Sequence, residues 1–100
     1  MSLFTVIVSF EDNSKGIEQV ESESPILALL EFVQSAESLE DHDRLLIRKT
    51  IIDNSQSLIH VANNTRGIWL WNHGSADLGK ILGGVIIQTD PDAPMRLKEV

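Results

Sequence analysis

A chain of 100 residues with 42% hydrophobic side chains and a formal net charge of −7 has the size and composition of one globular domain. It contains no cysteine, which excludes a disulfide framework and any thiolate metal site. No run approaches the ~18–20 apolar residues of a membrane-spanning helix, and the first residues lack a signal-peptide pattern. We therefore expect a single cytoplasmic domain over 1–100, with 91–100 as a loosely ordered tail.

The N-terminal residues predict two strands joined by a turn. Residues 3–10 alternate in the manner of a strand, and one of their two faces is wholly apolar. Turn-forming residues fill 11–16, and the charged stretch 17–21 suits a strand at the edge of a sheet. The apolar face of the first strand consists of Phe4, Val6, Val8 and Phe10.

The next stretch predicts the main helix of the domain. Ser24 is a favourable N-cap, and Pro25 suits the first helical position. A helix over about 25–36 places five apolar side chains on one stripe, which needs a sheet to cover it. We expect Leu30 and Val33 to be almost fully buried against the first strand. The stripe consists of Ile26, Leu29, Leu30, Val33 and Ala36.

The second half of the chain predicts an antiparallel meander. Residues 38–43 form a polar connection with room for one or two helical turns. The following apolar stretch predicts a strand, although a base in the middle of each of its faces leaves its register undecided. Turn residues separate it from the later strands. The strands are expected over 44–52, 57–62, 68–71 and 85–88.

Residues 75–84 allow two interpretations. One is a short second helix over about 76–82, capped by Ser75 and stopped at Gly83. The other is a strand that begins at Lys80 and carries a bulge at Gly83 and Gly84. With either alternative the order of elements predicts an α+β fold. We expect an antiparallel sheet of about five to six strands with the main helix packed on one face.

The negative charge is concentrated in one part of the chain. Residues 11–43 hold ten carboxylates and one base, and residues 44–100 hold five acids and seven bases, so charges of −9 and +2 give the net −7. An acidic half repels nucleic acid and anionic membranes, and we expect neither as a partner. It attracts a basic protein surface. The alternative interpretation is that the acids only keep a bacterial-type cytosolic protein soluble.

The sequence contains no motif that names a reaction. His42, His60 and His73 lack the spacing of a metal site on a helix, and no Gly-x-Ser-x-Gly elbow or phosphate-binding loop is present. We therefore expect no metal, no cofactor and no catalytic site. A small enzyme that uses a histidine and a carboxylate is the third hypothesis.

Trp69 and Trp71 share one face of their strand, and Ile68 and Leu70 share the other. If Ile68 and Leu70 meet the helix, both indoles lie on the uncovered face, where tryptophan is typical of protein interfaces. If the indoles meet the helix, they supply bulk for the core. The sequence leaves both alternatives open.

These patterns favour a small acidic protein-binding module. The leading hypothesis is an inhibitor or immunity-type protein that neutralises a basic protein partner such as a toxin. The alternative is a dimeric accessory or structural domain that uses an open sheet face. The expected partner-binding residues are Glu37, Glu40, Asp41, Asp43, Trp69 and Trp71.

Overall fold

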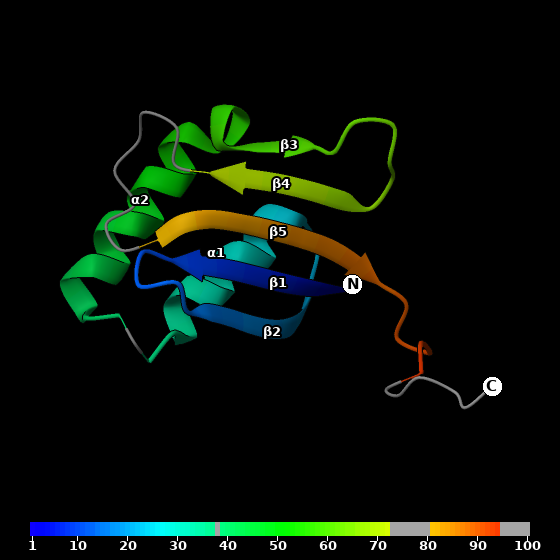
Figure 1. Ribbon diagram of the computed structural model, residues 1–100, viewed down its shortest axis with the longest axis horizontal. Helices are drawn as coiled ribbons and strands as arrows, with labels where there is room; N and C mark the ends of the chain where they lie inside the picture. Colours follow the sequence, from blue (N-terminus) through cyan, green and yellow to red (C-terminus); the bar gives the residue numbers. More distant parts are fainter. Residues whose placement is uncertain (38, 73–80, 95–100) are drawn as a thin grey trace.

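In the computed structural model, the described residues 1–37, 39–72 and 81–94 form one five-stranded antiparallel sheet and two helices; the side chains of 55–58 are not described. The spatial order of the strands is β2-β1-β5-β4-β3 (Figure 1), which confirms the predicted α+β fold. The strands are β1 (Ser2–Phe10), β2 (Lys15–Ser22), β3 (Ile59–Val61), β4 (Ile68–Asn72) and β5 (Ile81–Thr89), and the helices are α1 (Pro25–Ser35) and α2 (Asp41–Leu58).

Strands β1 and β2 form the predicted hairpin. Its turn contains Asn13 with φ of 69°, a left-handed conformation that asparagine tolerates. The backbone N–H of Ser14 donates to Asp12 Oδ1 at 2.9 Å, and the N–H of Phe10 donates to the Ser14 carbonyl at 2.9 Å. These bonds fix the register in which Val8 pairs with Gly16 and so set which residues of β2 face the core.

Helix α1 begins and ends where the sequence indicates. The Ser24 hydroxyl accepts a hydrogen bond from the Leu27 N–H at 3.2 Å, and Pro25 occupies the first turn. After Ser35 the backbone becomes extended at Ala36. The Ser35 hydroxyl donates to Glu18 Oε2 at 3.1 Å and thereby ties the end of α1 to β2. Val33 is fully buried as predicted, but Leu30 is only half-buried, because Leu29 and Phe32 point more directly at the sheet.

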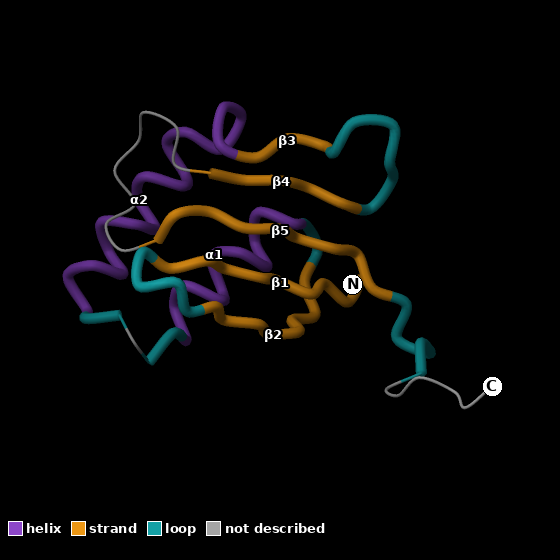
Figure 2. The backbone as a smooth tube through the Cα atoms, viewed as in Figure 1, coloured by secondary structure: helices purple, strands orange, loops and turns teal. Residues whose placement is uncertain are grey.

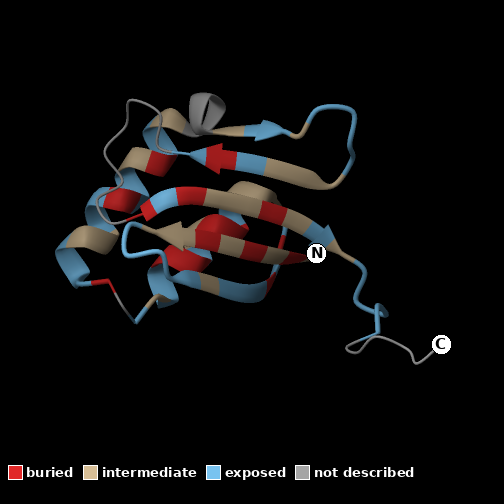
Figure 3. Ribbon diagram, in the orientation of Figure 1, coloured by how far each residue is buried: buried red, intermediate tan, exposed pale blue. Residues whose placement is uncertain are grey.

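Helix α1 lies on one face of the sheet, behind the strands in Figures 1 and 2. Along β1 the buried residues alternate with half-buried ones, as Figure 3 shows. Phe4, Val6 and Val8 face the helix, which confirms the predicted core face, while Phe10 at the strand end is half-buried. The sheet therefore has a helix-covered face and a face that no described helix covers. The latter is called the open face below.

The strand predicted over 44–52 is wrong, because these residues belong to α2. Ile47 and Ile51 lie one helical turn apart and are fully buried where α2 packs against α1. Leu45, Leu46 and Ile52 remain exposed on the outer side of the helix. Asn54 breaks the helical geometry with φ of −122°, which marks a kink. Among the described residues, no helix combines the length and the apolarity that a membrane crossing requires.

The C-terminal strands largely agree with the prediction, with two changes. The strand predicted over 57–62 shortens to Ile59–Val61 because α2 extends to Leu58. Ile81 and Leu82 belong to β5, which extends from Ile81 to Thr89. Ser9 pairs with Gly83 and Phe10 with Ile81, so β5 does carry a register shift, but the extra residue is Leu82 and not the predicted Gly83 and Gly84. Residues 73–80 and 95–100, with His73, most of the alternative second helix and most of the predicted tail, lie outside the described residues.

Candidate functional site

The open face carries a row of aliphatic side chains across four neighbouring strands. Ile17 on β2 pairs with Ile7 on β1, Ile7 pairs with Val85 on β5, and Val85 pairs with Leu70 on β4. Side chains that are paired in adjacent strands project from the same face. These four residues, called the aliphatic row, therefore form a continuous stripe across the sheet.

The aliphatic row is accessible. Ile17 is 69% exposed and Leu70 is 40% exposed, while Ile7 and Val85 in the middle of the sheet are half-buried by their neighbours. Three further apolar side chains extend the stripe toward the other end of the strands; they are Leu3, Ile68 and Ile87. The alternation of residues 3–10 puts Ile7 on the strand face opposite the wholly apolar one, a face that also carries Thr5 and Ser9, so the sequence pattern does not single out this row.

The remaining positions of the open face are polar and partly paired with each other. Gln19 Nε2 donates to Thr5 Oγ1 at 3.1 Å, and the Thr5 and Thr89 hydroxyls are hydrogen-bonded. Among the described strands, the charged side chains that alternate onto this face are Lys15 and Glu21, at opposite ends of β2. The face is therefore close to neutral on a chain whose net charge is −7.

The two tryptophans face the helices, so the core alternative is correct and the open-face alternative is wrong. Trp71 is 2% exposed and is among the largest fully buried side chains. Trp69 is half-buried and meets Phe4 edge-on, with ring centroids 6.0 Å apart. Ile68 and Leu70 take the opposite, open face. The open-face argument for partner binding by the two indoles therefore does not apply, and a partner-binding role for them stays a prediction.

The four acidic residues expected to bind a partner lie around the start of α2. Glu37, Glu40 and Asp41 are exposed, and Asp43 is half-buried. Asp41 and Asp43 belong to the first turn of α2, where the helix dipole favours negative charge. Folding therefore supplies a reason for acids at this position, which the sequence pattern did not reveal.

Arg44 joins the end of α1 to the start of α2. Its Nη2 and Nε donate to the Ala36 carbonyl at 2.7 and 3.2 Å, and its Nη1 donates to Asp41 Oδ1 at 2.8 Å. The Arg44 side chain is only 24% exposed, so these bonds form in a partly desolvated setting. One of the four acids is thus a structural ion-pair partner.

Arg44→Ala should lower the free energy of unfolding by about 1–3 kcal/mol, because the Ala36 carbonyl loses a charged donor. Arg48→Ala is the matched control, since Arg48 lies one turn later on the same helix and is exposed. The control should change stability by less than about 0.5 kcal/mol. Urea denaturation followed by circular dichroism measures both. Equal midpoints for the two variants would contradict the bridging role of Arg44.

His42 bridges two of the acids. Its Nδ1 lies 3.5 Å from Glu40 Oε2 and its Nε2 lies 3.2 Å from Asp43 Oδ1, which are ion pairs when the imidazole is protonated. The ligand atoms of these three residues lie within 4.8 Å of one another, a spacing that a metal ion could use. Glu40 and His42 are largely in solvent, however, and a solvated ion-pair group accounts for the arrangement.

The described histidines do not form a joint site. His42 stands at the start of α2, and His60 stands on β3 just beyond the end of this 18-residue helix. A helix of this length separates them by roughly 25 Å. His60 is exposed and pairs with Leu70 at the margin of the open face. His42 and His60 therefore do not meet in a shared catalytic site, and their positions give the enzyme hypothesis no support.

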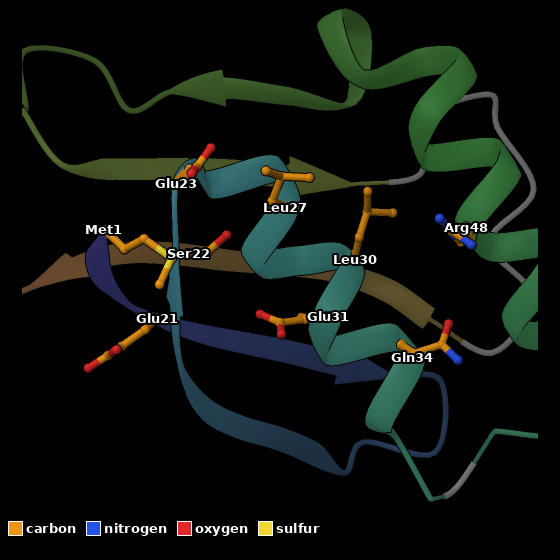
Figure 4. A pocket seen from close by; sticks show the side chains of 9 residues that line it. All are labelled: Met1, Glu21, Ser22, Glu23, Leu27, Leu30, Glu31, Gln34 and Arg48. Atoms are coloured by element: carbon orange, nitrogen blue, oxygen red, sulfur yellow. The ribbon is translucent and has the colours of Figure 1, made fainter.

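A shallow groove of about 430 Å³ lies on the helix-covered side, between the start of α1 and α2. Figure 4 shows Leu27 and Leu30 on its α1 wall and Arg48 on its α2 wall. Glu21 borders the groove but points away from Glu31 and α1. The acids and the single arginine line different ends, so the groove offers no convergent set of polar groups of the kind that fixes a small ligand.

Comparison of the chain with protein-family models, with curated proteins and with solved structures gave no match.

Proposed function

We propose that this chain is a protein-binding module that uses the open face of its sheet. The observation that carries the proposal is the aliphatic row, Ile17, Ile7, Val85 and Leu70, which is continuous in register across four strands. An antiparallel sheet that faces water on one side normally places polar residues there. This one places seven aliphatic side chains there instead.

The core does not need these side chains. It is already built from the helix-side residues of β1, β4 and β5 together with both helices. Exposed apolar patches that are contiguous and bordered by polar residues are typical of protein association. Lys15, Gln19 and Glu21 provide such a border along β2.

A binding role fits the chemistry better than catalysis. The described histidines stand apart, and the groove beside α1 lacks convergent polar groups. A chain without cysteine also suits a reducing compartment, so we propose a cytoplasmic setting for this interaction.

An inhibitor or immunity-type role against a basic partner is the second candidate. It is favoured by the exposure of Glu37, Glu40 and Asp41 and by the net charge of −7. In this role the acidic residues around the start of α2 would steer the partner, while affinity would still require apolar contacts. It ranks second because the first turn of α2 already explains two of the acids, Asp41 and Asp43.

The proposal is tested by a photo-crosslinking phenylalanine analogue placed, one site at a time, at Leu70 and at Glu31 in cells of the native source. Leu70 lies on the open face, and the exposed Glu31 lies on α1 as a matched control. Irradiation should give a discrete protein adduct from position 70 and none from position 31. Absence of an adduct from position 70, or the same adducts from both positions, would overturn the proposal.

A further inference from the structure

We infer that the partner on the open face is a second copy of this chain, packed face to face about a two-fold axis that runs across the strands. This inference rests on the proposed function, because it names the occupant of the same face. Its first support is charge. Two chains of net charge −7 repel each other, yet among the described strands the charged side chains on the open face are Lys15 and Glu21, which carry opposite charges. Two copies can meet through this face without placing the acidic residues around the start of α2 in the contact, because these residues lie in or just before that helix and not on the open face.

The size of the face is a second support. Five strands spaced by about 4.8 Å, with the longest running for about 30 Å, span roughly 500–700 Å² in projection. A stable interface buries about 800 Å² of accessible surface on each partner. The side chains make this face corrugated, so it can bury about 800 Å² of accessible surface only if a partner covers most of it. A second sheet of the same shape can cover most of it. Two sheets packed in this way form a sandwich with an aliphatic centre.

The positions of the two charges fix the direction of the axis. Lys15 and Glu21 lie six residues apart on β2, roughly 20 Å from each other. A two-fold axis across the strands at the level of Glu18 sets β2 antiparallel to β2 of the second copy. Lys15 then lies opposite Glu21 of the second copy, and the reverse pair forms by symmetry.

The same axis matches the apolar side chains of β5 and β4, while Ile7 and Ile17 lie over Thr5 and Gln19 of the second copy. Ile87 on β5 pairs with Ile68 on β4, and Val85 pairs with Leu70 two residues further along the same strands. The axis passes between these two pairs, so it places Ile87 and Ile68 of one copy over Val85 and Leu70 of the other. An axis along the strands would instead keep Glu21 at its own level. Lys15 would keep its own level as well and could not lie opposite Glu21 of the second copy.

The first experiment is sedimentation of the purified chain over about 1–200 µM. The expected species is a dimer of twice 11.1 kDa. Leu70→Glu places a charge in the aliphatic row and should give a monomer. Leu46→Glu, on an exposed leucine of α2, is the matched control and should remain dimeric. Circular dichroism confirms that each variant is folded. A monomeric wild type at 200 µM, or a dimer that Leu46→Glu disrupts and Leu70→Glu does not, would overturn the inference.

The second experiment tests the axis with exposed residues that folding tolerates. Lys15→Glu and Glu21→Lys should each weaken the dimer about tenfold or more, because each creates two like-charge contacts. Mixing the two variants should restore dimerisation, since the acidic face of one meets the basic face of the other. The double variant Lys15→Glu/Glu21→Lys should dimerise like the wild type. Single variants that dimerise as tightly as the wild type would overturn the axis and hence the inference.

Failure of the inference can be distinguished from failure of the proposed function. If the chain is monomeric and the crosslinker at position 70 captures a different protein, the open face binds that protein. The proposed function then holds, and the inference that a second copy occupies the face is wrong. If the chain is monomeric and position 70 gives no adduct, both are wrong.

Discussion

Leu29→Ala should lower the free energy of unfolding by about 3–5 kcal/mol, whereas Leu30→Ala should lower it by only about 1–2 kcal/mol. The two leucines are neighbours on α1, so helix propensity changes equally in both variants. They differ in burial. Leu29 is fully buried among the core residues, while Leu30 is half-buried on the groove beside α1. The truncation of Leu29 leaves a cavity under the helix, and the truncation of Leu30 opens onto solvent.

Urea denaturation at equilibrium measures both changes, and an unchanged slope shows that the unfolded state is comparable. A loss of 3–5 kcal/mol is a large share of the 5–15 kcal/mol that stabilises a typical domain. Equal losses for Leu29 and Leu30 would mean that α1 is rotated about its axis relative to the sheet. That result would restore the prediction made from sequence, in which Leu30 points at β1.

Helix α1 could be predicted because independent local signals agree. The Ser24 cap, Pro25 in the first turn and the apolar stripe all specify the same helix. Its rotation was harder to predict, since the stripe of five apolar residues, widened to six by Phe32, is broader than the face that a sheet covers. Contact with β1 and β2 selects Leu29, Phe32 and Val33 from within the stripe.

Helix α2 could not be predicted, because its sequence satisfies two periods. Ile47 and Ile51 lie on one face of a strand and also one turn apart on a helix. The β-branched residues near Thr50 favour a strand locally, and the exposed Leu45 and Ile52 blur the amphipathic pattern. Packing of α2 against α1 decides the outcome. The acidic residues before Arg44 are a helix-start signal that composition analysis assigned to partner binding instead.

The candidate site could be predicted only in part from the sequence. Alternation in β1 and β5 shows that both faces of each strand carry aliphatic residues, but only the pairing register aligns Ile7, Ile17 and Val85 in one row. The face taken by the tryptophans depends on the same register, since Trp71 pairs with Gly84 and Trp69 with the buried Ile86. Long-range pairing of this kind lies beyond local patterns.

Gly84→Ala should lower the melting temperature by on the order of 15 °C, because it disrupts the centre of the sheet. A Cβ at this position would lie 1.9 Å from the Ile7 carbonyl oxygen and 3.0 Å from Trp71 Nε1. The obstacle is backbone, so β1 and β5 must separate locally and the buried indole must move. A cost of about 3 kcal/mol or more corresponds to this shift in a domain of 100 residues.

Gly16→Ala is the matched control for this glycine. A Cβ there would lie 2.6 Å from the Phe32 ring, which is a side chain that contacts the edge strand β2. The ring and the edge can adjust, so we expect a cost of only about 1–2 kcal/mol. Thermal unfolding followed by tryptophan fluorescence reports on both variants, because Trp71 lies against Gly84. If Gly84→Ala melts within a few degrees of the wild type, the close approach of β1 to β5 is wrong, and with it the register that aligns the aliphatic row.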